Sequence, residues 1–528
     1  MQRVKAGKIL FKNDNTVSGF MEWVVAAVLL QSILGNMLSF YLTLGNQFSV
    51  VRWGINWGTN GILFLLVASC FILSRGSVKS RILAMLWPLL VMGIYIAAIF
   101  VHPTQIFEIA KGFLVFVVQG GTLAMAAWLL YTRVAALGGV IRKAIAIGLI
   151  VQPFYIGAII TFLLRTSTDT DNFGTISYLE IAYSALTILA IVLYYYGWGN
   201  GQYERHTKSI RVFSIIESVI SSVVLVVSGS RGALLGVAFL LVSVAVMVLL
   251  FKADKRIFVP LILVVLCVFG TYAALPKTSV SKARVENEYT RYETDMTPEQ
   301  ENEAREKTIV KKEENAENEA TDVVFLLKGR ELVLKKIPNG PTKKLCQKIG
   351  LNEGLLSIFY ENAWSGGGMS EIAYDMRDEL EQGASYGMEL NQAVYSVTNG
   401  SSARWYFWAL AAYELENHHG AGIAPLGYHL KYDSYAHNIW IEAYAEFGVI
   451  GGTVFLLITL LVLACAIREA GKNKENTYFL IFLAMIFTQL FLSGDLYGDR
   501  WFCFLIATGA VSIYTWKKNS CRKVEVSS

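Results

Sequence analysis

The chain has 528 residues, of which 54% are hydrophobic and only 16% are charged, and its mean hydropathy is +0.45. These values are too apolar for a soluble protein of this length and indicate a polytopic membrane protein. The formal net charge is +5, and the sequence contains no Walker loop, no GxGxxG after a strand and no GxSxG element, which argues against a nucleotide-driven pump.

Apolar stretches long enough to cross a bilayer, about 20 residues each, recur along the chain. We expect an all-α polytopic membrane protein with about twelve transmembrane helices. No small-residue cleavage site follows the first stretch, so we expect that helix to be retained. The expected spans lie near residues 20–42, 57–74, 82–101, 108–132, 144–164, 178–198, 210–229, 231–251, 257–275, 438–467, 477–493 and 501–516.

Lysines and arginines are concentrated in every second short connection between these spans, for example at residues 75–81, 133–143 and 205–211. Positive side chains stay on the cytoplasmic side of a membrane. We therefore expect both termini in the cytoplasm, an even number of spans and a long hydrophilic insert on the external side.

The insert, residues 276–436, carries 18 Lys and Arg against 25 Asp and Glu, a net charge of −7. The remainder carries 28 against 16, a net charge of +12. An acidic external part on a basic membrane body argues against nucleic acid as a partner. We divide the chain into a membrane domain of spans one to nine (1–275), a large external loop domain (276–436) and a membrane domain of spans ten to twelve (437–528).

The insert is expected to be mostly helical but not uniform. Arg284–Asp322 is polar and charge-mixed, which indicates a solvated helix or a disordered spacer. Val323–Gly350 is apolar and basic, which fits either an amphipathic piece on anionic headgroups or a solvated basic face. Ser401–Glu416 reads as a helix with an aromatic face.

The segment Ser228–Gly236, SGSRGALLG, opens an apolar stretch with an arginine at the expected external side. The guanidinium of Arg231 is a fixed fork that suits phosphate oxygens at headgroup depth. Gly232 and Gly236 would let a neighbouring helix or a ligand approach closely. The alternative is an arginine that only snorkels to the interface.

Arg404 begins the expected aromatic helix, which also contains Trp405 and Trp408. Aromatic rings stack on sugars, but they equally build a small core, and most loop arginines are solvated. Both interpretations of this helix stay open at this point.

His437 stands at the external mouth of the tenth span, beside Asn438 and about one turn before Glu442. Histidine exchanges protons near neutral pH, although a helix-end histidine can simply bond a headgroup. His418, His419 and His429 lie nearby in the sequence, so a metal site is a further alternative, but their spacing matches no HExxH or paired CxxC pattern.

Together these motifs make the chain similar to the O-antigen ligase/polymerase superfamily of bacterial membrane proteins. The resemblance runs from about Val219 to Phe455 and rests on SGSRGALLG, the large external loop and the sequence AHNIWIEAYAEFGVIGG at 436–452. Within the loop, Arg404, an aromatic helix, the Gly420–Gly422 turn and His437 resemble the family's order. The charged stretch 284–322 has no counterpart in that pattern.

The resemblance implies a type C glycosyltransferase-like fold in the cytoplasmic membrane of a bacterium. It implies transfer of a glycan from an undecaprenyl-diphosphate carrier to an acceptor hydroxyl, either of another lipid-linked glycan or of a different acceptor, on the outer face of that membrane. Neither a metal nor ATP nor another cofactor is implied. A flippase and a chain-length regulator are the implied protein partners.

By position, Arg231 and Arg404 would contact the diphosphate and His437 would be the essential histidine. Trp405, Trp408 and Asn438 would line the substrate site beside them.

Two alternatives from other classes remain. Intramembrane acids such as Glu217, Glu442 and Glu446 fit an ion-coupled carrier or a flippase of lipid-linked oligosaccharide. A carrier of that kind would be expected to show two related halves, which the sequence does not display. A non-catalytic assembly protein of the polysaccharide machinery is the third hypothesis. Within the family, a polymerase is favoured slightly over a ligase.

Overall fold

The structure is a computed structural model that describes the membrane helices and several separate pieces of the insert. The described residues are 14–43, 49–132, 137–165, 172–173, 176–198, 207–277, 279–282, 310–313, 322–327, 330–334, 408, 411, 414–415, 418–432, 435–472 and 478–527.

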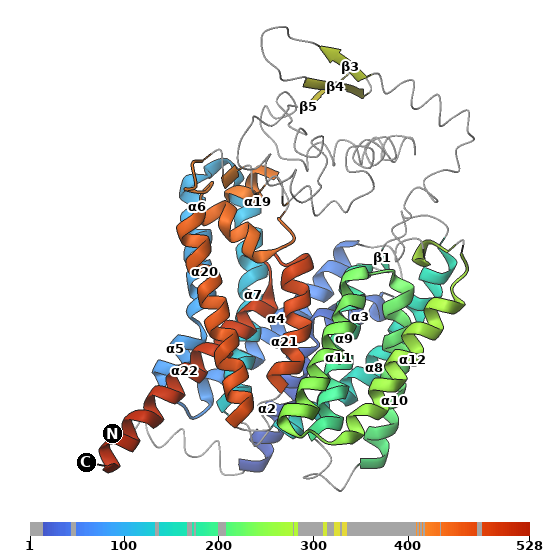
Figure 1. The fold of residues 1–528 in the computed structure, drawn as a ribbon, viewed down its shortest axis with the longest axis vertical. Coiled ribbons are helices and arrows are strands. Elements are labelled where there is room, and N and C mark those ends of the chain that lie inside the picture. The colour runs from blue at the N-terminus through green and yellow to red at the C-terminus, as the bar shows by residue number, and fades with distance from the viewer. Residues whose placement is uncertain are drawn as a thin grey trace. The chain divides into compact units, whose positions relative to one another are not determined.

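The described chain is mostly helical (Figure 1). The helices are α2 (Asp14–Leu29), α3 (Gln31–Leu42), α4 (Ser49–Leu73), α5 (Val78–Ala84), α6 (Leu86–Val101), α7 (Ile106–Thr132), α8 (Leu137–Leu164), α9 (Tyr178–Trp198), α10 (Thr207–Ser228), α11 (Arg231–Phe251), α12 (Phe258–Ala274), α19 (Gly427–Tyr432), α20 (Ile439–Lys472), α21 (Tyr478–Ser493) and α22 (Arg500–Ser527). Short 3₁₀ turns, η1 (Pro103–Gln105) and η4 (Lys255–Ile257), precede α7 and α12.

Among the described residues, eight helices are long and apolar enough to cross a membrane, or up to ten if each of two bent pairs counts as one span. The pairs are α2 with α3, bent by 84°, and α5 with α6, bent by 54°. The polytopic, predominantly helical membrane architecture is thereby confirmed. The count of twelve stays a prediction, because α21 and the apolar part of α22, Arg500–Thr515, are shorter than a typical span.

The chain divides into two compact units, and each is described by itself. Unit 1 comprises Met1–Glu286, Thr459–Gln489 and Gly498–Ser528, and unit 2 comprises Asn287–Ile458 and Leu490–Tyr497. The first part of α20 therefore belongs to the same unit as the insert, and its later part belongs to the helical bundle.

In unit 1, α10 packs against α8, α9 and α12, while α22 packs against α7. Fully buried rings such as Trp128, Phe154 and Phe502 fill the spaces between helices. Many outward-facing positions are also apolar: Phe100 is 81% exposed and Leu249 is 77% exposed. A soluble protein would not expose a contiguous apolar surface of this kind, whereas a lipid bilayer solvates it favourably.

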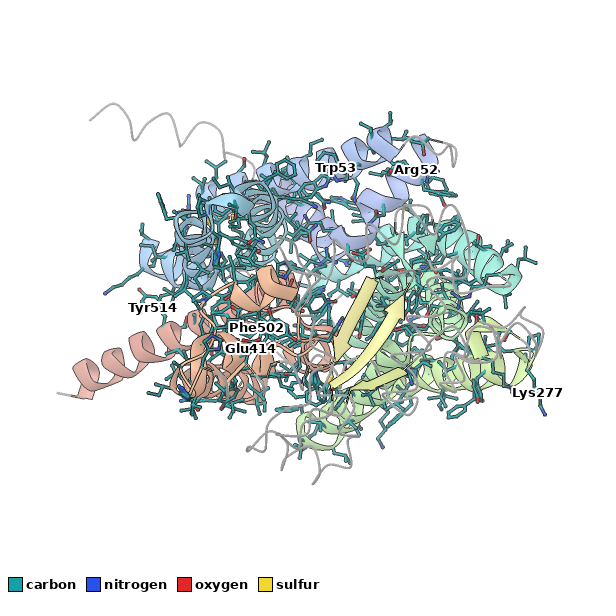
Figure 2. All side chains as sticks on the ribbon, turned by 90° about the horizontal axis from the view of Figure 1, so that it is seen from above. Arg52, Trp53, Lys277, Glu414, Phe502 and Tyr514 are labelled. Atoms are coloured by element: carbon teal, nitrogen blue, oxygen red, sulfur yellow. The ribbon has the colours of Figure 1, made fainter. Side chains whose placement is uncertain are left out.

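Polar side chains join α3 to α4. Asn56 donates from Nδ2 to Asn36 Oδ1, and Asn60 donates from Nδ2 to Asn56 Oδ1, each over 3.2 Å. At the start of α4, Arg52 is 9% exposed and donates from Nε to Thr43 Oγ1 (3.3 Å), whereas the neighbouring Trp53 is 58% exposed (Figure 2). Side-chain amides that bond across helices hold them together where lipid supplies no partner.

Short strands occur in both units. In unit 1, β1 (Asn172–Phe173) pairs antiparallel with β2 (Ile176–Ser177). In the insert, β3 (Val310–Glu313), β4 (Asp322–Leu327) and β5 (Arg330–Leu334) form an antiparallel sheet in the order β3-β4-β5.

The expectation of a solvated helix or a disordered spacer is therefore wrong for residues 310–313. Val323, Val324 and Phe325 have a high strand propensity, and Val310 pairs with Phe325 across the intervening sequence. A charge-rich strand of this kind is stabilised by its apolar pairing partner and not by its own composition. The segment that begins at Val323 starts as a hairpin, with two residues between β4 and β5.

Candidate functional site

Arg231 is the first residue of α11, at a sharp turn after α10. Gly229 has φ 78°, a conformation that glycine adopts without steric cost. Ser230 caps the helix by accepting a hydrogen bond from Ala233 N to Oγ (3.3 Å), and Ser228 Oγ accepts one from Ser230 N (3.3 Å). The sequence predicts that a helix begins at the Ser-Gly motif with Arg231, and the start of α11 confirms this prediction.

Gly236 explains why a second glycine follows Arg231. A Cβ at this position would meet the Leu186 side chain of α9, with Cδ1 at 3.4 Å and Cδ2 closer still. The close approach of a neighbouring helix is therefore the role of Gly236. This packing fixes the first two turns of α11 and, with them, the backbone that carries Arg231.

Arg165 and Ser281 hold the other side of the same turn. Arg165 Nη2 donates to Ser228 O (3.0 Å) and to Ser281 Oγ (3.2 Å), with a longer contact to Val227 O (3.4 Å). Ser281 Oγ donates to Val227 O (2.5 Å). The last carbonyls of α10, which have no partner within the helix, are thus satisfied by side chains from two other segments.

We expect Arg165→Ala to lower the free energy of unfolding of the bundle by about 2–4 kcal/mol, because it leaves the buried Ser228 carbonyl without its donor and removes a buried charged side chain. Arg165 is only 7% exposed and lies over the Phe162 ring at 4.9 Å. The measurement is thermal unfolding of the purified protein in detergent. The matched control is Arg256→Ala, which removes an arginine with a side chain that is 60% exposed. Equal effects of the two substitutions would contradict the capping role.

In unit 2, helix α20 is interrupted at Gly448, which has φ 72° and ψ −175°. An unbroken helix would pair Ala445 O with Val449 N, and the interruption releases both groups. The loop before α19 takes them: Ile423 N donates to Ala445 O (2.8 Å), and Val449 N donates to Gly420 O (2.9 Å). The turn predicted at 417–422 therefore docks, through its described residues, on the interruption in α20.

The contact between the loop before α19 and the interruption in α20 requires a glycine on each side. A Cβ at Gly422 (φ 83°) would meet the backbone of Glu446 and Gly448, and a Cβ at Gly448 would meet Gly420 and Ala421. Both positions also have a positive φ that other residues rarely adopt. The two glycine segments that the sequence places about 25 residues apart are thus one backbone interface.

The start of α20 is built around Asn438. Its Oδ1 accepts from Trp440 N and Ile441 N, each over 3.1 Å, and its Nδ2 donates to Phe491 O (3.2 Å). Asn438 is 2% exposed, so this N-cap is buried and ties the helix to residue 491. Both ends of its amide bond backbone groups, so Asn438 positions the start of α20, and its contact with a substrate stays a prediction.

His437 directly precedes this cap and has φ 55°. Its ring centroid lies 4.1 Å from that of Tyr435, with the planes tilted by 48°. A left-handed backbone is uncommon for a residue other than glycine, and such positions cluster at functional sites. The predicted place of His437 just ahead of the helix is confirmed.

Two buried carboxyl groups lie one turn apart below His437, on the first half of α20. Glu446 Oε2 accepts from Leu426 N (2.8 Å) and from the Tyr497 hydroxyl, while Glu442 Oε2 accepts from Leu496 N (3.4 Å). Burial and the neighbouring Glu446 raise the pKa of Tyr497 well above its usual value, so the phenol stays protonated and donates. Through these hydrogen bonds the two glutamates attach the loops at Leu426 and at residues 496–497 to α20.

Two tryptophan rings lie near the Phe491 ring in unit 2. The Trp408 centroid lies 6.1 Å from the Phe491 centroid in an edge-to-face arrangement, and the Trp440 centroid lies 6.3 Å away. Trp408, Ala411 and Glu414 are helical, as expected for the segment 401–416. Arg404 and Trp405 lie outside the described residues.

The described histidines do not form a metal site. His418 Nδ1 lies 2.9 Å from Glu414 O and 3.5 Å from Glu414 Oε2, and His419 is exposed. Within the part of the chain that the structure describes, no three His, Cys, Asp or Glu side chains come close enough to hold a metal.

No family model, curated protein or solved structure matches this chain. The chemistry of the site therefore has to be argued from its residues. Arg231 lies in unit 1, whereas His437, Asn438 and Trp408 lie together in unit 2.

Sequence reasoning missed three residues that build these places: Arg165, Ser281 and Tyr497. Arg165 is a basic residue at the end of an apolar stretch, in a connection with few others, and that rarity is the one usable signal in the sequence. Nothing in the sequence marks Ser281 or Tyr497, because their partners are backbone groups and a carboxyl group far away in the chain.

The predicted groups with a chemistry of their own are the Arg231 guanidinium in unit 1 and, in unit 2, the His437 imidazole and the rings around Phe491. A guanidinium binds phosphate oxygens in two parallel hydrogen bonds, and an imidazole exchanges a proton near neutral pH. Aromatic rings bind the apolar faces of sugars as well as each other.

Proposed function

We propose that the chain is a bacterial membrane glycosyltransferase of the O-antigen ligase/polymerase type. It moves a glycan from an undecaprenyl-diphosphate carrier to an acceptor hydroxyl on the outer face of the cytoplasmic membrane, with both termini in the cytoplasm. Of the two reactions, we propose polymerisation, in which the acceptor is another lipid-linked unit.

One observation carries the proposal. His437 is held in a left-handed turn immediately before a buried cap, and the cap itself is bonded across to Phe491 O. The imidazole is the ionisable side chain of that turn, and it lies beside the ring of Tyr435. Residues other than glycine that are held in a left-handed backbone are over-represented at active sites and ligand-binding sites.

In this reaction His437 accepts the proton of the attacking hydroxyl as the new glycosidic bond forms. The bond between the sugar and the diphosphate breaks, and the electron pair goes to the leaving diphosphate. Arg231 and Arg404 would stabilise the charge that develops there, since guanidinium groups near a low-dielectric bilayer act strongly on phosphate oxygens. The energy comes from the activated donor.

The proposal predicts that Arg231→Ala and His437→Asn both abolish mature surface glycan. The experiment is complementation of a deletion strain by wild type and each variant, at matched levels in the membrane. Surface glycan is resolved by size on a gel, and the lipid-linked pool is extracted in parallel. Arg256→Ala is the control, because Arg256 is exposed and pairs only loosely with Asp254 (3.8 Å).

The glycan that accumulates in the inactive variants distinguishes a polymerase from a ligase. Single repeat units left on the acceptor indicate a polymerase, and long chains that accumulate on the carrier indicate a ligase. Normal glycan with both variants would contradict the enzyme and favour a flippase, another carrier or an assembly protein.

A further inference from the structure

Helix α10 carries a polar stripe along its buried side. Ser214, Glu217, Ser218, Ser221 and Ser222 recur at helical spacing, and each is 0% exposed. Ser214, Ser218 and Ser222 donate to carbonyls four residues earlier in the same helix, over 2.6–2.8 Å. Those serines are satisfied locally. Glu217 and Ser221 are not: among the described residues, neither Glu217 oxygen nor Ser221 Oγ has a hydrogen-bond partner.

The Glu217 carboxyl lies against α8 at a glycine. A Cβ at Gly148 would be 3.0 Å from Glu217 Oε1 and 3.1 Å from Oε2, so the absence of a side chain there makes room for the carboxyl. Gln152, one turn along α8, donates from Nε2 to Gly148 O (2.9 Å), and its Oε1 has no partner among the described residues. The carboxyl and the amide therefore lie at the same turn of α8.

The next polar group along α8 is already satisfied. The Tyr155 hydroxyl lies 2.8 Å from Ser184 Oγ, and Ser184 donates to Ile181 O. Two further oxygen atoms without a partner among the described residues stand within about one helical turn of this contact: Ser221 Oγ, four residues after Glu217, and Gln152 Oε1, four residues after Gly148. All three side chains are at most 2% exposed, and no described lysine, arginine or histidine pairs with the carboxyl.

A buried carboxylate without a positive partner is expensive in a lipid-embedded bundle. Oxygen atoms of carboxylate, hydroxyl and amide are the ligands that hard cations prefer. With Glu217 ionised, the set would carry a single negative charge, which one monovalent cation neutralises, whereas a calcium site usually gathers several carboxylates. The donor set therefore fits an ion of charge +1.

We propose that Glu217, Ser221 and Gln152 form a sodium-binding site between α8 and α10. Sodium supplies the positive charge that the described residues do not, and it holds the two helices together at the level of Gly148. The site is independent of the proposed glycan transfer. The thermal stability of the bundle should therefore depend on the sodium concentration even when the ionic strength is constant.

The test is thermal unfolding of the purified full-length protein in detergent, with choline chloride replaced stepwise by sodium chloride at constant ionic strength. Wild type is expected to gain on the order of 4 °C in Tm, with a saturating dependence on sodium. Glu217→Gln keeps the shape and removes the charge, so its Tm should not respond. Glu180→Gln, which changes an exposed glutamate of the same bundle, should respond like wild type.

Ser221→Ala keeps the carboxylate and removes one ligand, so it should raise the half-saturating sodium concentration at least about tenfold. Ser221→Ala therefore tests the sodium site even if Glu217→Gln does not fold. An unchanged Tm of wild type in sodium and choline would overturn the proposal. So would an undiminished sodium response in Glu217→Gln, or in Ser221→Ala if Glu217→Gln cannot be purified.

Discussion

Purified His437→Asn protein is expected to transfer glycan about 10²- to 10⁴-fold more slowly than wild type, which is the usual loss on removal of a positioned general base. Asparagine is the informative replacement because His437 has φ 55°, and asparagine tolerates a left-handed backbone better than alanine does. The variant therefore removes the imidazole while the turn and the Asn438 cap stay in place. Donor binding should be unaffected, since the diphosphate is assigned to arginines.

The measurement is the initial rate of chain extension or transfer with a lipid-linked donor, at saturating donor, in detergent or in liposomes. His419→Asn is the matched control: His419 belongs to the same unit, has φ 51° and is exposed. Equal rates for His437→Asn and wild type would remove His437 from the reaction. Equal losses in both histidine variants would indicate damage to the turn and not to catalysis.

Gly448→Ala is expected to destabilise unit 2 by about 2–4 kcal/mol, a large effect for one methyl group. The new Cβ would meet the carbonyl oxygens of Gly420 and Ala421, and alanine would have to adopt φ 72°. The chain can relieve the contact only if the loop leaves α20, and that exposes the released backbone groups to an apolar environment.

Limited proteolysis of the loop at 418–426 and thermal unfolding, both on protein in detergent, report this change. Gly270→Ala is the control, because a Cβ at Gly270 meets nothing within 4 Å and alanine favours the helix interior. The control should be neutral or slightly stabilising. A Gly448→Ala protein as stable and as protease-resistant as the control would show that the docked loop contributes little.

The membrane class and the start of each motif helix follow from local sequence. A polar group of residues that precedes a long apolar run predicts a helix start, and α11 and α20 begin where Arg231 and His437–Asn438 indicate. Gly420 and Gly422 also predict the turn at 417–422, because glycine interrupts regular secondary structure. These features need no information from elsewhere in the chain.

Other features depend on contacts between distant residues. The span that we expected at 438–467 as one helix is interrupted at Gly448, because a loop some twenty-five residues earlier supplies the missing hydrogen bonds. The strand β3 exists because β4 pairs with it. Arg165 caps α10 across more than sixty residues of sequence. Periodicity and composition carry no information about such partners.

The interruption in α20 has a consequence for how the chain enters the membrane. Residues 418–426 are synthesised before α20, so the loop is present when that helix leaves the ribosome and the insertion machinery. The helix carries unpaired backbone groups at Gly448 into lipid unless the loop accompanies it. We therefore expect insertion of α20 and the helices after it to depend on residues 418–426, and shortening that segment should trap the protein during insertion.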